Sequence, residues 1–423
     1  MSGDGETAGR TPEGPSLATG LRSLGDPTIT YPLAPPPTRG CPETNTEAVQ
    51  YPLEVTYDYD AVDPGLFDEP PRPGLERWAP LMPPLAGDGL GAGDTPLVET
   101  PRLADAMGLE TALYLKDESA NPTWSQKDRL ARCVVSAAVR EGARGVVASS
   151  SGNHGAAVAA AAAKNRLEAV ILTAPETPQA VQVFVRRYGA TLLAIPDADA
   201  RRETVDRLVD WGFHPASTRT PVHTGHPYGP ESYKPIAYEI HHDLGRVPGT
   251  VAVPTCHAEL LYGIWKGFRE LERLGITAEM PRMLACEPAA LGPLGSALEA
   301  SEPVASVGAG ETDAYSIAAT TSSVRGRRAV EESDGAQVGF TEADLETAGR
   351  RLARVGHWQE SAGVAGVAGL ARALEDGRDV DGPVVAVGTS SGFKNGERDG
   401  VPVVEPEWEA IETALRKAGH GPD

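Results

Sequence analysis

The sequence is poor in cysteine and in positive charge, and each shortage excludes a class of protein. Its four cysteines, Cys41, Cys133, Cys256 and Cys286, lie far apart without a CxxC spacing, which argues against a disulfide framework and against a four-thiolate zinc site. Lys and Arg together number 38 against 59 for Asp and Glu, a formal charge of −21. Because such a charge repels phosphate backbones and anionic membranes, we expect neither nucleic acid nor a membrane as a partner. The cysteine spacing leads us to expect no bound metal.

Long apolar runs are missing as well. No stretch of about twenty apolar residues occurs, and the chain does not start with the charged-then-apolar pattern of a secretory signal. A cytoplasmic location is therefore expected. The 423 residues, of which 40% are hydrophobic, are enough for two or three globular domains.

The first fifty residues differ in composition from the rest. The stretches "MSGDGETAGRTPEGPSLATG" and "PLAPPPTRG" are rich in polar residues, Gly and Pro, and each proline removes an amide donor and fixes φ. We expect residues 1–50 to form a mobile leader. Apolar alternation begins at "YPLEVTYDYD", from Tyr51 to Asp60.

Beyond Ala112 the pattern alternates between strand and helix. Short apolar runs of strand type are separated in most cases by longer amphipathic or Ala-rich segments. These runs are "ALYLK", "GVVAS", "AVILTA", "ATLLAI", "GTVAVP", "PRMLACE" and "PVVAVG". The order predicts an α/β fold with parallel sheets covered by helices on both faces. In such folds ligands bind at the carboxyl ends of the strands, where loops lead into helix N-termini.

Three of these junctions are unusual: "NPTWSQKDRLA", "SSSGNHGAAVAAAAAK" from Ser149 to Lys164, and "VAVGTSSGFKNG" from Val385 to Gly396. In the second, Gly152 and Gly155 allow a tight turn between strand and helix, next to several polar side chains. Taken alone, this junction is either a cradle for an anion or an ordinary Gly-Asn turn with solvated serines.

The three junctions, with one further motif, resemble pyridoxal-phosphate enzymes of fold type II, and in particular the threonine synthase group. The family's "NPTGSFKDR" is matched by "NPTWSQKDR", its "SSGNHG" by Ser150 to Gly155, its "NPYGxEGYKTxAYEI" by "HPYGPESYKPIAYEI", and its "TGxGLK" by "TSSGFK". The resemblance extends from Tyr31 to about Asn395. It implies two three-layer α/β/α domains with pyridoxal 5′-phosphate in the cleft between them, and a homodimer.

The resemblance also assigns roles to single residues. Lys127 is expected to form the Schiff base with the cofactor and to have a lowered pKa. Asn153 is expected to contact the cofactor's 3-hydroxyl group, and Thr389, with Ser390, its pyridine nitrogen. Ser150, with Ser151 and nearby amides, is expected to hold the substrate's carboxylate.

The chain departs from the family at the phosphate-binding loop. Where relatives have glycines, "PTCHAELLYG" places Cys256, His257, Ala258 and Glu259. A carboxylate there opposes a dianion, so cofactor binding is weakened, rearranged or lost. His257 either contacts the phosphate or fills the space of a glycine.

Substrate choice is expected to depend on residues beside the lysine. Trp124 and Gln126 replace a glycine and a phenylalanine of the family motif. Lys234, with Lys116 and Arg129, is a candidate for binding a phosphorylated substrate. For Arg129 a structural ion pair is an equal alternative.

The predicted domains are a small mobile one at 125–230 and a large cofactor-binding one at 51–124 and 231–423. The leader before them retains Cys41 alone where many relatives have paired cysteines, so we expect a metal-free remnant of a zinc ribbon.

The expected activity is that of a lyase or synthase. It would eliminate and replace a group at the β or γ carbon of an amino acid, with O-phosphohomoserine as the family's reference substrate. There are two alternatives. One is related chemistry of the cysteate synthase or threonine dehydratase type, and the other is a diverged protein that makes little or no use of the cofactor.

Overall fold

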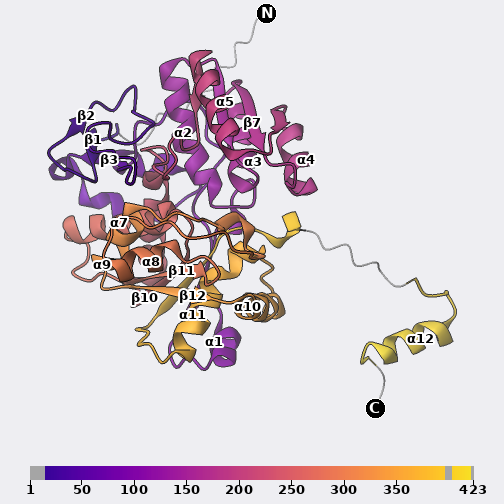
Figure 1. The fold of residues 1–423 in the computed structure, drawn as a ribbon. Helices are drawn as coiled ribbons and strands as arrows, with labels where there is room; N and C mark the ends of the chain where they lie inside the picture. The colour runs from indigo at the N-terminus through magenta and orange to yellow at the C-terminus, as the bar shows by residue number, and fades with distance from the viewer. Residues whose placement is uncertain (1–14, 396–402, 421–423) are drawn as a thin grey trace, which may run out of the picture.

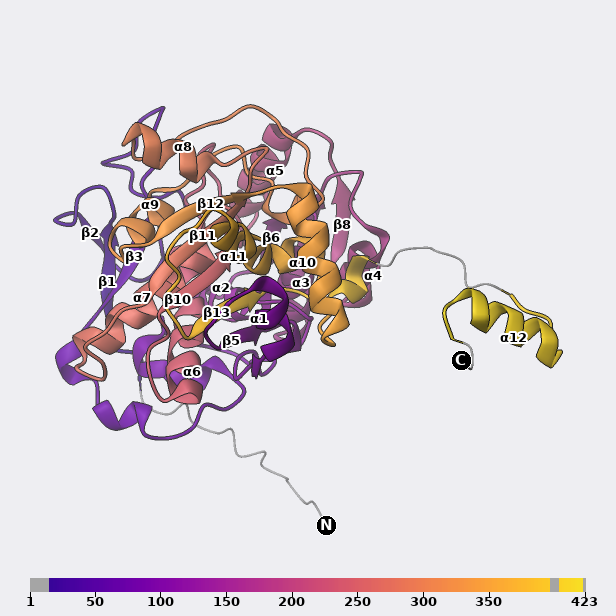
Figure 2. The same cartoon turned by 90° about the horizontal axis from the view of Figure 1, so that it is seen from below.

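Two sheets of mostly parallel strands organise the chain. The computed structural model describes residues 15–395 and 403–420. The larger sheet has the order β12-β11-β10-β13-β5-β4, and the smaller one β8-β7-β6-β9. All neighbouring pairs are parallel except β4 and β5. Figure 1 shows the smaller sheet with its helices above the larger one, and Figure 2 shows the strands of the larger sheet from below.

The strand bounds agree with the apolar runs of the sequence. The larger sheet contains β4 (Leu97–Glu99), β5 (Leu113–Asp117), β10 (Thr250–Pro254), β11 (Arg282–Pro288), β12 (Ala336–Phe340) and β13 (Val384–Gly388). The smaller sheet contains β6 (Gly145–Ser149), β7 (Glu168–Thr173), β8 (Thr191–Ala194) and β9 (Phe213–Pro215). Each predicted run coincides with a strand to within one residue at either end.

Helices cover both faces of each sheet, because the strands are apolar on both sides. In the larger sheet Val251 and Val253 pack in the core that includes α7, whereas the intervening Ala252 packs with α10 and α11. In the smaller sheet Val147 packs with α5, and its neighbours pack with α2 and α3. The helices are α1 (Pro101–Met107), α2 (Lys127–Glu141), α3 (Asn153–Lys164), α4 (Gln179–Arg187), α5 (Ala198–Asp210), α6 (Lys234–Leu244), α7 (Glu259–Arg273), α8 (Pro293–Ala300), α9 (Val324–Glu331), α10 (Glu342–Arg354), α11 (Ala365–Glu375) and α12 (Trp408–Lys417).

The segment expected to be a mobile leader is in large part a third sheet. Strand β1 (Ala18–Ser23) pairs antiparallel with β2 (Thr30–Tyr31) and with β3 (Leu53–Tyr57). Leu21, Cys41 and Leu53 are buried in the main hydrophobic core. The Pro-rich composition misled the prediction here, since β1 forms its longer ladder with β3, some thirty residues away in the chain. Residues 1–14 of the predicted leader lie outside the described residues.

A buried ion-pair network fixes the start of α2. Arg129, which is fully buried, contacts Glu118 through Nε at 2.7 Å and Glu239 through Nη1 at 2.7 Å. Lys116 contacts the same Glu239 at 2.7 Å. Arg129 was a candidate for binding a substrate phosphate or for a structural ion pair, and in the structure it forms the ion pair.

The two sheets divide the chain near the boundaries that the sequence suggested, and we keep the division into a small part at 125–230 and a large part as a proposal.

Among the described residues, none of the helices is long and apolar enough to cross a membrane.

Candidate active site

A cavity of about 390 Å³ lies where the carboxyl ends of strands from both sheets meet. The loops that follow β6, β9, β10 and β13 line it, together with the start of α2. This is the position in which parallel α/β folds bind ligands. Lys127, Ser150, Ser151, Asn153, Thr389, Gln126 and the stretch from Cys256 to Glu259 all contribute to its wall, so the structure brings most of the predicted site residues together.

Lys127 is the first residue of α2 and opens on the cavity. Its Nζ lies 5.8 Å from the centre of the Tyr233 ring. Burial lowers the pKa of Lys127, but Tyr233 and the carboxylate of Glu259 outweigh that effect, so that the pKa is raised. The sequence suggested a lowered pKa. The difference arises because Tyr233 and Glu259, which belong to distant segments of the chain, favour the ammonium form.

Asn153 links the two halves of the molecule across the cavity. Its Oδ1 accepts a hydrogen bond from Lys394 Nζ at 2.6 Å, and its Nδ2 donates to Glu360 Oε1 at 2.8 Å. Asn153 begins α3 beside the smaller sheet, while both partners belong to the segments around the larger one. Burial lowers the pKa of Lys394 to about 8 and raises that of Glu360. Because an amide nitrogen carries two hydrogens, Asn153 retains one for a ligand.

The serines of the second junction shape the turn that leads into α3. Ser150 Oγ accepts hydrogen bonds from the backbone N–H of Gly152 at 3.2 Å and of Gly155 at 3.0 Å. Ser151 Oγ accepts one from the backbone N–H of Ala174 at 3.1 Å. Both serines also line the cavity. The side chains that stabilise the turn are therefore also in a position to contact a ligand.

The loop between β10 and α7 holds the four residues that replace the family's glycines. Ala258 adopts φ +59°, in the left-handed region that favours glycine, at the N-cap of α7. Glu259 follows as the first residue of the helix, where the helix dipole favours a negative charge. Burial raises the pKa of the Cys256 thiol to about 11, so the thiol stays protonated at neutral pH and is a poor nucleophile.

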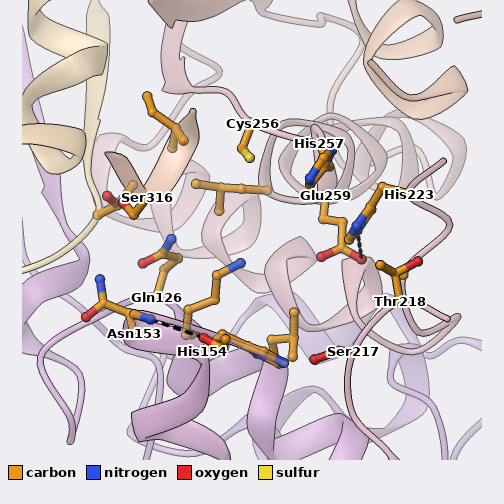
Figure 3. A pocket seen from close by; sticks show the side chains of 18 of the residues that line it. Gln126, Asn153, His154, Ser217, Thr218, His223, Cys256, His257, Glu259 and Ser316 are labelled. Carbon is orange, nitrogen blue, oxygen red and sulfur yellow. Dashed lines mark hydrogen bonds and ion pairs between the residues drawn. The ribbon is translucent and has the colours of Figure 1, made fainter. Parts of the chain in front are cut away.

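Glu259 is surrounded by nitrogen atoms that the sequence did not bring to attention. His223 Nε2 lies 3.4 Å and Arg325 Nη1 3.9 Å from its Oε1, and His223 stacks on His257 with ring centres 4.1 Å apart. Figure 3 shows Glu259 turned toward His223. Burial raises the pKa of Glu259, but His223, Lys127 and Arg325 outweigh it and hold the pKa well below its usual range. No short motif marks His223 or Arg325, since both reach the site from segments far from α7 in the chain.

Gln126 and Thr389 complete the wall near the lysine. The backbone N–H of Gln126 donates to the carbonyl of Thr389 at 3.1 Å. Within the part of the chain that the structure describes, the buried Oε1 of Gln126 has no hydrogen-bond partner, which leaves an acceptor for a ligand. Figure 3 shows Gln126 beside the cavity, near Asn153.

Two predicted site residues lie outside the cavity wall. Trp124 is 42% exposed, adopts φ +63°, and packs edge-on against Phe184 with ring centres 5.4 Å apart. Ser390 is buried, and its Oγ donates to the carbonyl of Trp124 at 3.0 Å. Trp124 is therefore part of a surface aromatic cluster, and Ser390 holds the loop that carries it.

Lys234 is also remote from the cavity. It is fully buried, with Nζ 2.9 Å from Glu231 and 2.8 Å from Glu270, and it lies 3.8 Å from the centre of the Tyr57 ring. These two carboxylates neutralise the charge of Lys234 within the core. With Lys116 and Arg129 in the other buried network, the predicted basic cluster for a substrate phosphate does not assemble at this cavity.

Comparison with known proteins identifies the family. A family model described as "Pyridoxal-phosphate dependent enzyme" matches residues 89–390. The chain belongs to this family. Threonine synthase from Halalkalibacterium halodurans is 32% identical over 72% of this chain and 84% of its own, and threonine synthase from Methanocaldococcus jannaschii is 29% identical over 81% and 87%. The resemblance to threonine synthases and the pyridoxal 5′-phosphate cofactor are thus confirmed.

Solved structures support the fold. Maize serine racemase matches with a TM-score of 0.62 and 18% identity over 77% of this chain and 94% of its own. The processed form of threonine deaminase isoform 2 from Solanum lycopersicum matches with a TM-score of 0.61 and 20% identity, over 78% and 84%. The predicted fold type II architecture is confirmed.

The residues at the cavity fit this cofactor. Lys127 supplies an amine for the aldehyde, Thr389 a hydroxyl group, and Asn153 an amide hydrogen. At the α7 end, His257 lines the cavity and its Nδ1 is buried without a hydrogen-bond partner among the described residues. Arg325, which contacts Glu259 but is not part of the cavity wall, also has a buried Nε without a partner there. Nitrogen atoms in that position suit a phosphate group, although Glu259 lies among them.

Proposed function

We propose that the protein is a pyridoxal-phosphate-dependent lyase or synthase that eliminates and replaces a group at the β or γ carbon of an amino acid. One observation carries the proposal: the amine of Lys127 opens on a cavity that Asn153 and Thr389 also line. The preferred substrate class is O-phosphohomoserine or a related activated amino acid, as in the threonine synthases that the chain resembles.

The residues of the chain divide the work around the cofactor. When bound, the cofactor's ring withdraws electrons from the substrate's Cα and makes its hydrogen acidic. Lys127 would remove and return that proton. The hydroxyl of Thr389 would meet the cofactor's pyridine nitrogen, and a neutral partner there would favour elimination and replacement over transamination. The turn formed by Ser150 and Ser151 would hold the substrate's carboxylate at the start of α3.

A second candidate is a dehydratase acting on an unphosphorylated hydroxy amino acid. Among the described residues that line the cavity, Lys127 is the one Lys or Arg, whereas a phosphorylated substrate is usually held by several cations. This charge pattern favours a neutral leaving group. The structural likeness to threonine deaminase is consistent with it.

Absorption spectroscopy with substrate screening tests the proposal. The purified protein with added pyridoxal 5′-phosphate should show the visible band of a lysine imine, and Lys127→Ala should lack it, while Lys164→Ala, at an exposed lysine, should keep it. Phosphate release from O-phosphohomoserine identifies the first candidate, and ammonia release from threonine or serine the second. A band that persists in Lys127→Ala would refute the assignment of the lysine.

Two further parts of the proposal rest on the sequence alone, the oligomeric state on the family resemblance and the location on the lack of a long apolar run or secretory pattern. We propose a homodimer and a cytoplasmic location. Light scattering coupled to size-exclusion chromatography measures the first, and a mass of one 44.3 kDa chain would contradict it.

A further inference from the structure

The side chains around Glu259 accommodate one negative charge, that of its carboxylate. Arg325 is fully buried and held by the carbonyls of Thr224 at 2.6 Å and Leu53 at 3.0 Å. At Gly225, whose φ is +63°, a Cβ atom would lie 1.9 Å from Glu259 Oε1. Only glycine therefore leaves room for the carboxylate where it now lies, between His223 and Arg325.

By the family resemblance, the cofactor's phosphate would bring two more negative charges to the loop between β10 and α7. At neutral pH Glu259 is ionised, and Arg325 and Lys127 are its nearby cations. His223 is neutral, because burial first, then His257 and Arg325, lower its pKa to about 4. One carboxylate and a phosphate dianion together carry three negative charges against the two positive charges of Arg325 and Lys127, and at low dielectric such an excess is unfavourable. We therefore expect binding to need one more positive charge at this end of the cavity.

We propose that His223 takes up one proton from solvent when the cofactor's phosphate binds, so that an imidazolium lies between Glu259 and the phosphate. The titratable and charged groups around His223 are Glu259 and His257 from α7 and its loop, Arg325 from α9 and His154 from α3, and Lys127 lines the same cavity. The inference rests on the cofactor binding in this cavity and not on which amino acid the protein converts.

His223 suits this role better than the histidines next to it. His226 is engaged on both ring nitrogens, with His214 Nε2 at 3.0 Å and the backbone N–H of Tyr228 at 3.1 Å. Among the described histidines, His223 alone has a ring nitrogen within ion-pair distance of Glu259. Because His223 and His257 stack at 4.1 Å, protonation of one opposes protonation of the other, and one proton is expected.

Calorimetry with pyridoxine 5′-phosphate isolates the phosphate from the chemistry of Lys127, since this probe lacks the aldehyde. Titrations at pH 7.5 in two buffers of different ionisation enthalpy should show uptake of about one proton. Between pH 7 and 8.5 the probe's phosphate is already a dianion, its second pKa being about 6. Affinity should therefore fall about tenfold per pH unit, as linkage to a single proton requires.

Four variants test the assignment. His223→Gln should bind the probe more weakly at pH 7 and with no dependence on pH. Glu259→Gln should bind it about tenfold or more tightly at pH 8.5, because the repulsion is removed. Glu287→Gln is the matched control, since Glu287 is buried on the neighbouring β11 but does not line the cavity, and it should keep the slope of the parent. His223→Asn and thermal unfolding without cofactor check that lost binding is not lost folding.

Other results would overturn the inference. A parent affinity independent of pH, a slope retained in His223→Gln and His223→Asn, or weaker binding by Glu259→Gln would each do so while leaving the proposed function intact. Failure of both the probe and pyridoxal 5′-phosphate to bind at any pH would overturn the proposed function as well.

Discussion

Replacing Arg129 by Met should destabilise the protein strongly, because the side chain neutralises two buried carboxylates at once. Its guanidinium contacts Glu118 at 2.7 and 2.8 Å, and Glu239 at 2.7 Å through two nitrogens. In Arg129→Met, Glu239 keeps Lys116 as a partner. Glu118 keeps its hydrogen bonds to Thr95 and Asn121 but has no ion pair with another cation among the described residues. Removing one partner of a buried ion pair costs about 3–5 kcal/mol.

Urea unfolding at pH 7 measures the effect, with the free energy of unfolding extrapolated to zero denaturant. Arg140→Met, at an exposed arginine of the same helix, is the control and should change stability by no more than about 0.5 kcal/mol. The double variant Arg129→Met with Glu118→Gln should recover at least about 1 kcal/mol, because the orphaned charge is gone. A loss below about 1 kcal/mol for Arg129→Met would refute the reasoning.

The pH dependence of this loss has a definite sign. Burial raises the pKa of Glu239, but Arg129 and Lys116 outweigh it and hold the pKa well below the usual 4.5. Stabilisation by the ion pair is therefore fully present above about pH 4.5 and is lost as the pH falls through the lower pKa of the folded state. The gap between parent and variant should be constant near neutral pH and narrow below about pH 4.5.

Three more predictions follow from side chains whose roles the structure redefines. Trp124→Gly should leave the ranking of substrates unchanged in a kinetic comparison, and stability within about 1 kcal/mol, since relief of the positive φ offsets the lost packing on Phe184; a changed ranking would restore a substrate-binding role. Lys234→Met should lower the free energy of unfolding by about 3–5 kcal/mol, and a variant with normal stability but a raised KM would contradict this. Burial raises the pKa of Glu287 from 4.5 to about 7, so parent stability should fall by about 3 kcal/mol between pH 4.5 and 7; Glu287→Gln should remove that decline, and an unchanged profile in urea unfolding would refute it.

The strands and the motifs at their ends could be predicted from local patterns. Strands such as β6 and β10 are short, apolar on both faces and followed by helices, so their period and order determine a parallel sheet without further information. Lys127, Asn153 and Thr389 lie at junctions of this kind, which is why the sequence placed them at one site. The third sheet was missed because its pairing partners are distant in sequence and its segment is rich in Gly and Pro.

What a side chain contacts was decided by the tertiary structure. Lys234 and Arg129 belong to motifs that resemble those of the family, yet both are enclosed by carboxylates from other elements. A buried cation without such partners would strongly destabilise the fold. Trp124 is next to the site in sequence but turns to the surface, since its left-handed backbone directs it toward Phe184. The charge balance around Glu259 depends on His223 and Arg325, which the chain brings together from segments about a hundred residues apart. The sequence by itself determined where a lysine, an asparagine and a hydroxyl would meet, and only folding determined which charges surround them, because charge interactions act through space and leave no local pattern.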